Sequence, residues 1–153
     1  MKPALPKVVV IGCGFGGIEA VRALSKGPVE ITVVDRTNHH VFQPLLYQVA
    51  TATLTPTDIA LPIRWLLRSQ KHTEVTIGDV TRIDVDRHVA LLADGRELAY
   101  DYVIVAAGAR HSYFGHPEWE TRAPGLKSVE DAIELRRRWL SAFERVESAT
   151  DAA

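Results

Sequence analysis

The stretch VVVIGCGFGG, from Val8 to Gly17, decides the fold. Its first four residues form an unbroken β-branched run, which is typical of a strand buried on both faces of a parallel sheet. A glycine-rich turn ends this strand, and the residues from Ile18 to Ser25 carry apolar side chains at helical spacing. The stretch therefore predicts a strand, a tight turn and a helix.

A second buried strand, from Glu30 to Asp35, completes a strand–helix–strand unit of about 30 residues. The turn has the pattern GxGxxG, and Asp35 closes the second strand 23 residues after Gly12, as in a dinucleotide-binding fingerprint. Gly12 allows the tight turn, Gly14 leaves space for a pyrophosphate, and Gly17 lets the helix pack close to the strand. The helix N-terminus offers free N–H groups and a partial positive charge to phosphate.

Asp35 indicates which dinucleotides fit. Its carboxylate can accept hydrogen bonds from an adenosine ribose, whereas a 2′-phosphate at 4 Å would cost about 4 kcal/mol at an effective dielectric near 20. Arg36 would offset part of that repulsion. The sequence therefore favours FAD or NAD over NADP.

The middle of the chain is less regular. We expect residues 36–57 to be a long connection with local turns, and Asp58 to Arg68 to be a helix with Pro62 near its start. Four short strands separated by turn dipeptides predict a small antiparallel meander: Glu74–Ile77, Val80–Val85, His88–Leu92 and Arg96–Ala99. Tyr102 to Val105 returns to the buried parallel pattern.

A long helix is expected from Val129 to about Glu147, capped by Ser128 with Asp131 three residues later. Its expected inner stripe is Ala132, Ile133, Leu140 and Phe143. These elements together predict an α/β fold: a Rossmann-like domain with a parallel sheet plus a small antiparallel β-meander.

Composition narrows the functional classes. The 153 residues include 18 Lys and Arg and 19 Asp and Glu, which gives a net charge of -1. The chain therefore has no excess of positive charge that would attract nucleic acid. The single cysteine, Cys13, excludes an internal disulfide and a cysteine-based zinc site, and we expect it to be a small filler despite a helix N-terminus that would lower its pKa. The six histidines show no metal-ligand spacing and are expected on surfaces and loops. No apolar run is long enough for a membrane span, so we expect a cytoplasmic protein, with peripheral contact to the cytoplasmic face of the membrane left open.

Five stretches resemble the type II NADH dehydrogenases, which are single-subunit, FAD-dependent NADH:quinone oxidoreductases of the pyridine nucleotide oxidoreductase superfamily. They are VVVIGCGFGGIEAVRAL (Val8 to Leu24), HHVFQPLLYQVAT (His39 to Thr51), LTPTDIALPIR (Leu54 to Arg64), YDYVIVAAGA (Tyr100 to Ala109) and GLKSVEDAIELRRR (Gly125 to Arg138). The FQPLLYQVA stretch is the most specific of them, and the resemblance covers nearly all of residues 7–147.

The resemblance implies FAD as the cofactor, NADH as the substrate of the complete family protein, and a quinone as electron acceptor. The residues that it implies at the cofactor are Gly12, Cys13, Gly14, Phe15, Gly16, Gly17, Asp35, Arg36, Gln43, Pro44, Leu45, Leu46, Val80, Ala107 and Gly108. Gln43 to Leu46 would contact the flavin and Val80 the adenine, both through the main chain. Ala107 stands where the family's ATG motif has threonine, so one hydroxyl is lost. No side chain suggests an acid or base, so we expect no catalytic residue, and no metal.

The resemblance also predicts what is missing. Family members continue with a second GxGxxG domain for NADH, and this chain has none. Residues 1–126 would be the first part of the FAD-binding domain, and residues 127–153 a helix leading toward an absent NADH domain. We expect the chain alone to be inactive, with homo-oligomers through its uncovered apolar surface. The alternatives are a non-catalytic dinucleotide-binding fragment and a plain NAD-binding Rossmann protein.

Overall fold

The computed structural model describes residues 4–149, and the chain divides into two compact units. The first unit contains the residues up to 40 and those from 62 to 108, and the second contains residues 41–61 and the chain from 109 onward. The outer ends of the two predicted domains, residues 1–3 and 150–153, lie outside the described residues. The predicted division between residues 126 and 127 concerns cofactor domains and stays a prediction.

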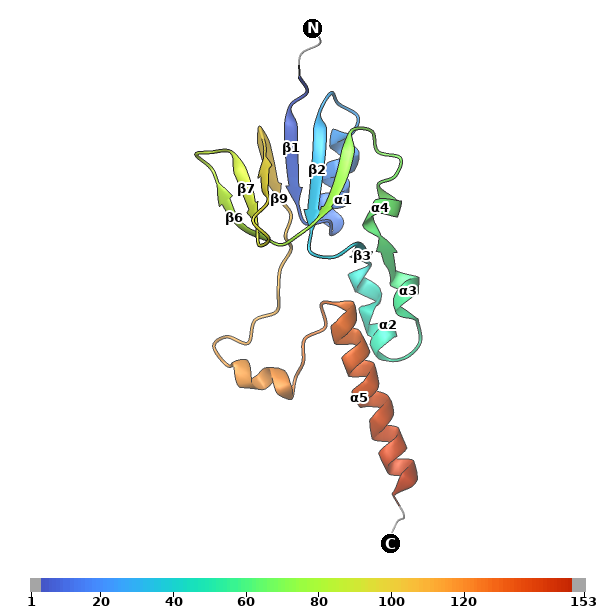
Figure 1. The fold of residues 1–153 in the computed structure, drawn as a ribbon. Helices are drawn as coiled ribbons and strands as arrows, with labels where there is room; N and C mark the ends of the chain where they lie inside the picture. The colour runs from blue at the N-terminus through green and yellow to red at the C-terminus, as the bar shows by residue number, and fades with distance from the viewer. Residues whose placement is uncertain (1–3, 150–153) are drawn as a thin grey trace. The chain divides into compact units, whose positions relative to one another are not determined.

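A four-stranded parallel sheet forms the centre of the first unit (Figure 1). Its strand order is β5-β2-β1-β9, and the strands are β1 (Lys7–Ile11), β2 (Glu30–Asp35), β5 (Thr73–Ile77) and β9 (Tyr102–Val105). The helix α1 (Phe15–Leu24) connects β1 to β2. The predicted strand–helix–strand unit is confirmed, and the carboxyl ends of β1, β2 and β9 lie at one edge of the sheet because all are parallel.

The antiparallel meander is present but smaller than the sequence predicts. It contains β6 (Val80–Asp84), β7 (Val89–Leu92) and β8 (Glu97–Ala99), in that order. The first of the four predicted meander strands, β5, instead pairs in parallel with β2, from Thr73 opposite Ile31 to Ile77 opposite Asp35. The alternation of a short strand does not distinguish a parallel edge strand from a hairpin strand, so the sequence grouped β5 with its neighbours.

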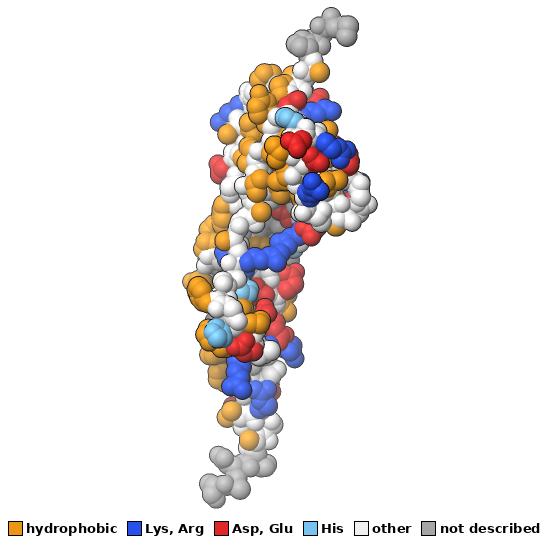
Figure 2. Space-filling model, turned by 90° about the vertical axis from the view of Figure 1, so that its left-hand side faces the viewer, with side chains coloured by type: hydrophobic (Ala, Val, Ile, Leu, Met, Phe, Trp, Pro, Cys, Tyr) orange, Lys and Arg blue, Asp and Glu red, His pale blue; other side chains and the backbone are white. Residues whose placement is uncertain are grey.

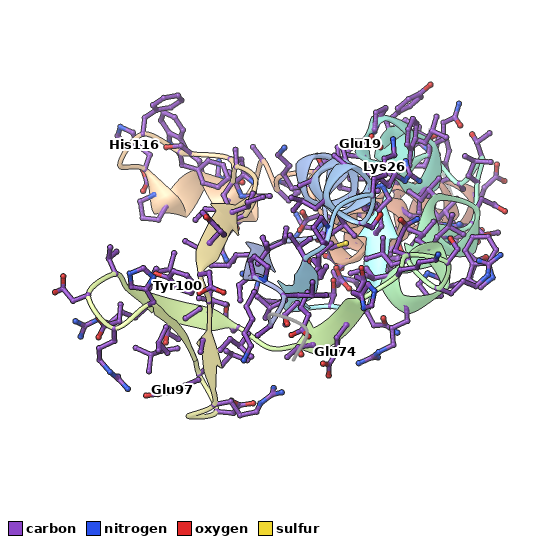
Figure 3. All side chains as sticks on the ribbon, turned by 90° about the horizontal axis from the view of Figure 1, so that it is seen from above. Glu19, Lys26, Glu74, Glu97, Tyr100 and His116 are labelled. Atoms are coloured by element: carbon purple, nitrogen blue, oxygen red, sulfur yellow. The ribbon has the colours of Figure 1, made fainter. Side chains whose placement is uncertain are left out.

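The parallel sheet is covered on both faces, which explains the unbroken apolar run in β1. Val8 and Val10 pack with α1 and with Ile63, whereas Val9 packs with β7 of the meander. Figure 3 shows α1, where Glu19 is labelled, on one side of the sheet and the meander, where Glu97 is labelled, on the other. Val8, Val9 and Val10 are therefore buried although their side chains alternate between the two faces.

Residues 36–68 form short elements rather than one connection and one helix. They are β3 (His39–Val41), the 3-10 helix η1 (Gln43–Leu45), α2 (Leu46–Ala50), α3 (Pro56–Ile59), β4 (Ala60–Pro62) and α4 (Ile63–Leu66). The predicted helix from 58 to 68 is wrong, because the residue before Pro62 is driven into extended backbone and β4 pairs there with β3. Ile59 and Ile63 also join two different cores, one in each unit.

In the second unit, α5 (Val129–Ser148) packs its first turns against α2. The 3-10 helix η2 (Pro117–Thr121) precedes it. Ser128 caps α5 as predicted: its Oγ accepts the Asp131 N–H at 3.1 Å, and the Asp131 carboxylate accepts the Ser128 N–H at 2.9 Å. The predicted inner stripe is wrong beyond Ala132, because Ile133, Leu140 and Phe143 are 46%, 44% and 56% exposed.

Charges of both signs are interspersed on the face of the molecule drawn in Figure 2. On α5, Glu134 pairs with Arg138 at 2.8 Å and with Arg137 at 2.9 Å. Hydrogen bonds from Arg137 and Arg138 lower the pKa of Glu134 to about 2. Within residues 4–149 no helix combines the length and the apolar character needed to cross a bilayer.

The cap at Ser128 gives a testable prediction for the stability of α5. Ser128→Ala removes one acceptor from the helix N-terminus and should cost about 1 kcal/mol of helix stability. Ser141→Ala, in the middle of the same helix, is the matched control and should be neutral or slightly stabilising. Thermal melts followed by circular dichroism at 222 nm measure both, and equal melts for the two variants would contradict the capping role.

Candidate functional site

The glycine turn between β1 and α1 has the geometry that the fingerprint predicts. Gly12 has a φ of +94°, and a Cβ there would collide with the Ala106 carbonyl. A Cβ on Gly17 would collide with the Gly12 carbonyl, so α1 packs against the turn without room for a side chain. Gly14 differs, because a Cβ built on it meets no atom of the described chain within 4 Å. The space at Gly14 is therefore open.

Asp35 is tied to this turn. Its Oδ2 accepts the Cys13 N–H at 2.7 Å, and its Oδ1 accepts the Thr37 N–H at 2.9 Å and the Thr37 hydroxyl at 3.2 Å. A carboxylate can accept about four hydrogen bonds, so capacity remains for one ribose hydroxyl. Arg36 is exposed beside it. Asp35, the last residue of β2, thus lies beside the glycine turn, and hydrogen bonds to both of its carboxylate oxygens fix its orientation.

Two further segments reach the same edge of the first unit. The Gly78 N–H donates to the Asp35 carbonyl at 2.9 Å, which brings the start of β6 at Val80 close to the end of β2. The Ala106 N–H donates to the Ile11 carbonyl at 2.7 Å, so Ala107 and Gly108 follow directly beside the glycine turn. The structure therefore brings together these predicted site residues of the first unit: Gly12, Cys13, Gly14, Phe15, Gly16, Gly17, Asp35, Arg36, Val80, Ala107 and Gly108.

The other predicted residues, Gln43 to Leu46, belong to the second unit. Leu46 is 2% exposed and packs in the core of that unit with Val49 and Ala132, so its side chain serves packing. The Gln43 Oε1 accepts from the Lys127 ammonium at 3.4 Å. The main chain of η1 is the part of this segment that remains for a ligand.

Cys13 is a filler of the first core, as expected, and its environment opposes reactivity. It is 1% exposed. Burial and the charge of Asp35 raise the pKa of its thiol to about 12. The lowering expected from the helix N-terminus is wrong, because removal from water and the charge of Asp35 both raise the pKa of the thiol.

The sequence missed three side chains that contact predicted site residues. Thr37 orients Asp35, Lys127 reaches Gln43, and the His40 ring lies 3.1 Å, Nδ1 to oxygen, from the Cys13 carbonyl. His40 was expected on a surface or loop, but it is half-buried in β3 and contacts the glycine turn. Its strand spans only three residues, which is too short for periodicity to show which side it faces. No cluster of His, Cys, Asp and Glu in residues 4–149 could hold a metal ion.

A glycine turn and a carboxylate at the carboxyl edge of a parallel sheet are typical of the dinucleotide-binding folds. Comparison with known families agrees: residues 6–148 match the model of the pyridine nucleotide-disulphide oxidoreductases. The chain belongs to this family.

The relatives of the chain point to a narrower group within this family. The chain is 47% identical over 152 residues to the type II NADH:quinone oxidoreductase Ndh of Mycobacterium tuberculosis, and 49% identical over 150 residues to NdhA of the same organism. These alignments cover 97% and 96% of this chain but 33% and 32% of the relatives, so the chain spans about a third of their length. The expected resemblance to the N-terminal part of type II NADH dehydrogenases is confirmed.

Solved structures show the same fold. NDH2 of Plasmodium falciparum in complex with NADH superposes with a TM-score of 0.84 at 22% identity, covering 97% of this chain and 32% of that one. The sulfide:quinone oxidoreductase of Aquifex aeolicus gives 0.78 at 24% identity, covering 91% and 32%. The predicted Rossmann-like architecture with a small meander is confirmed.

The two glycines of the turn give opposite predictions. Gly14→Ala should leave the melting temperature unchanged, since the new methyl meets no described atom, but should weaken FAD at least about tenfold by occupying the pyrophosphate space. Gly17→Ala forces a methyl against the Gly12 carbonyl and should cost about 1–3 kcal/mol of stability. Differential scanning fluorimetry and FAD fluorescence titration measure both effects, and unchanged FAD affinity in Gly14→Ala would remove the phosphate role.

The pKa of Cys13 gives a prediction on reactivity. At pH 8 the native thiol is almost entirely neutral, while a free thiol with a pKa of about 8.5 is partly ionised. Because only the thiolate attacks, iodoacetamide should label native Cys13 at least about a hundredfold more slowly than the same chain in guanidinium. Mass spectrometry follows the labelling, and prompt modification of the native chain at pH 8 would show that the thiol is accessible and ionised.

Proposed function

We propose that this chain is the FAD-binding portion of an NADH:quinone oxidoreductase. The observation that carries the proposal is the glycine turn, where the space over Gly14 is open while Gly12 and Gly17 are closed by the protein itself. The whole-protein activity is proposed from the relatives named as type II NADH:quinone oxidoreductases. When bound, FAD supplies the redox chemistry, taking a hydride from NADH and passing two electrons to a quinone.

The residues of the first unit support a dinucleotide at the edge where β1, β2 and β9 end. The open face of the turn at Gly14 and the start of α1 would take the pyrophosphate, since N–H groups of a helix N-terminus bind phosphate. Asp35 would accept from the adenosine ribose, and the main chain at Val80 would lie at the adenine. The negative charge of the Asp35 carboxylate favours a ligand without a 2′-phosphate.

FAD is favoured over NAD by the second predicted segment. Gln43 to Leu46 form η1 and the start of α2, and their flavin contact is proposed from the resemblance of this stretch to the type II NADH dehydrogenases. We propose that the protein lies in the cytoplasm and makes peripheral contact with the cytoplasmic face of the membrane, because a quinone acceptor is dissolved in the membrane. The acid and base for hydride transfer are not required from this chain, because the flavin carries that chemistry.

Asp35→Asn tests the ribose contact. The variant keeps the shape of the side chain but removes its charge and one acceptor, so FAD affinity should fall by about 1–3 kcal/mol. Asp86→Asn makes the same change of charge in a turn of the meander and should bind FAD as the wild type does. Fluorescence titration measures both affinities. Flavin absorbance of the purified wild type distinguishes FAD from NAD. A colourless protein that binds NAD would support the alternative of a plain NAD-binding Rossmann protein.

The chain alone should turn over poorly and self-associate. Only one GxGxxG is present, and the second half of α5 leaves Trp139, Phe143 and Val146 54%, 56% and 75% exposed. Such a contiguous apolar face favours association with another protein surface, here a homo-oligomer. We expect negligible NADH oxidation with added FAD and quinone, and a mass above that of one chain in light scattering at high concentration. Robust turnover by a clean monomer would contradict both expectations.

A further inference from the structure

The main chain of Cys13 is held from two sides in the glycine turn. Its N–H donates to Asp35 Oδ2 at 2.7 Å, and its carbonyl oxygen lies 3.1 Å from His40 Nδ1. A carbonyl oxygen can only accept, so Nδ1 of His40 carries the proton, and it does so in the charged imidazolium as well. The bond to the carbonyl therefore persists in both protonation states of the ring.

His40 is itself fixed in place. It lies in β3 and is half-buried, and its ring meets the ring of Phe15 edge-on at 5.1 Å between centroids and 90° between planes. Phe15 is the first residue of α1, so the contact joins β3 to the helix that begins at the glycine turn. The donor that holds Cys13 thus belongs to β3 and packs against the first residue of α1.

Holding the Cys13 carbonyl also orients the next amide. The Cys13 carbonyl and the Gly14 N–H belong to one planar peptide group, and every described peptide bond is trans, so the two groups point in opposite directions. With the carbonyl turned to His40, the Gly14 N–H points away from His40. Gly14 is also the glycine of this turn whose Cβ position meets no described atom within 4 Å.

Without such a contact this peptide group would be less restrained. The turn contains four glycines among six residues, and glycine gives the least steric resistance to a change of φ and ψ. A turn that is already in its binding conformation loses less entropy when a ligand arrives, which increases affinity without adding a ligand contact.

We propose that His40 is a positioning residue of the dinucleotide site, which holds the Cys13–Gly14 peptide group so that the Gly14 N–H is presented to the pyrophosphate. The proposal rests on the proposed function, since it concerns the same ligand. It adds a residue that touches the turn rather than the ligand, and it predicts an effect on phosphate-bearing ligands only.

Three variants separate positioning from general damage. His40→Phe keeps a ring against Phe15 but removes the donor, and His40→Asn keeps an N–H donor at a position close to that of Nδ1. His39→Phe is the matched control, because His39 is the adjacent residue of β3 and alternate strand residues point to opposite sides. Affinities for FAD and ADP, which both contain a pyrophosphate group, are compared with that for adenosine, which has no phosphate, on the 153-residue chain; scanning fluorimetry reports its stability.

We expect His40→Phe to weaken FAD and ADP about tenfold, the usual size for loss of one hydrogen bond that organises a site, with adenosine affinity and melting temperature unchanged. His40→Asn should recover most of that loss, and His39→Phe should match the wild type. Unchanged FAD and ADP affinity in His40→Phe overturns the inference, as does an equal loss for adenosine, which would mark general damage. A wild type that binds ADP but not FAD contradicts the flavin proposal while the ADP series still decides on His40, and a wild type that binds neither overturns both.

Discussion

The structure of the first unit depends on how closely the main chain approaches itself at Gly12. On one side of Gly12 lies the Ala106 carbonyl at the end of β9, and on the other the start of α1 presses Gly17 against the Gly12 carbonyl. Three elements that are far apart in the sequence therefore meet where a single methyl group does not fit. The hydrogen bond from Ala106 to Ile11 and the bond from Cys13 to Asp35 are possible only because this contact is close.

Much of the first unit could be predicted because its signals are local. The β-branched run of β1, the spacing of the glycines and the position of Asp35 each have one physical interpretation when they occur in that order. The cap of α5 was equally clear, since Ser128 and Asp131 satisfy each other within one turn. In these places the residue type and the backbone conformation require each other, and distant contacts change little.

The predictions failed where distant contacts decide the structure. β5 joins the parallel sheet through pairing with β2, about 40 residues earlier in the chain, and its own sequence carries no sign of that partner. Ile59 and Ile63 have helical spacing, yet each belongs to a different core, so the backbone between them becomes extended. Along α5 an apolar stripe exists, but α2 is short and covers only its first turns. His40 was missed for the same reason, since its partner, the Cys13 carbonyl, lies 27 residues away.

The pairing of β1 with β9 affects the order in which the chain can fold during synthesis. Val8 lies opposite Tyr102, so 94 residues separate the partners. At roughly 5–20 residues per second, the ribosome needs about 5 to 20 s to produce that interval. During this time β1 can pair with β2 on one side only, and its other edge, with the apolar face that the meander later covers, stays open to solvent or to a chaperone. β1 is thus synthesised long before it can be fully enclosed, which exposes an apolar strand of the nascent chain to aggregation.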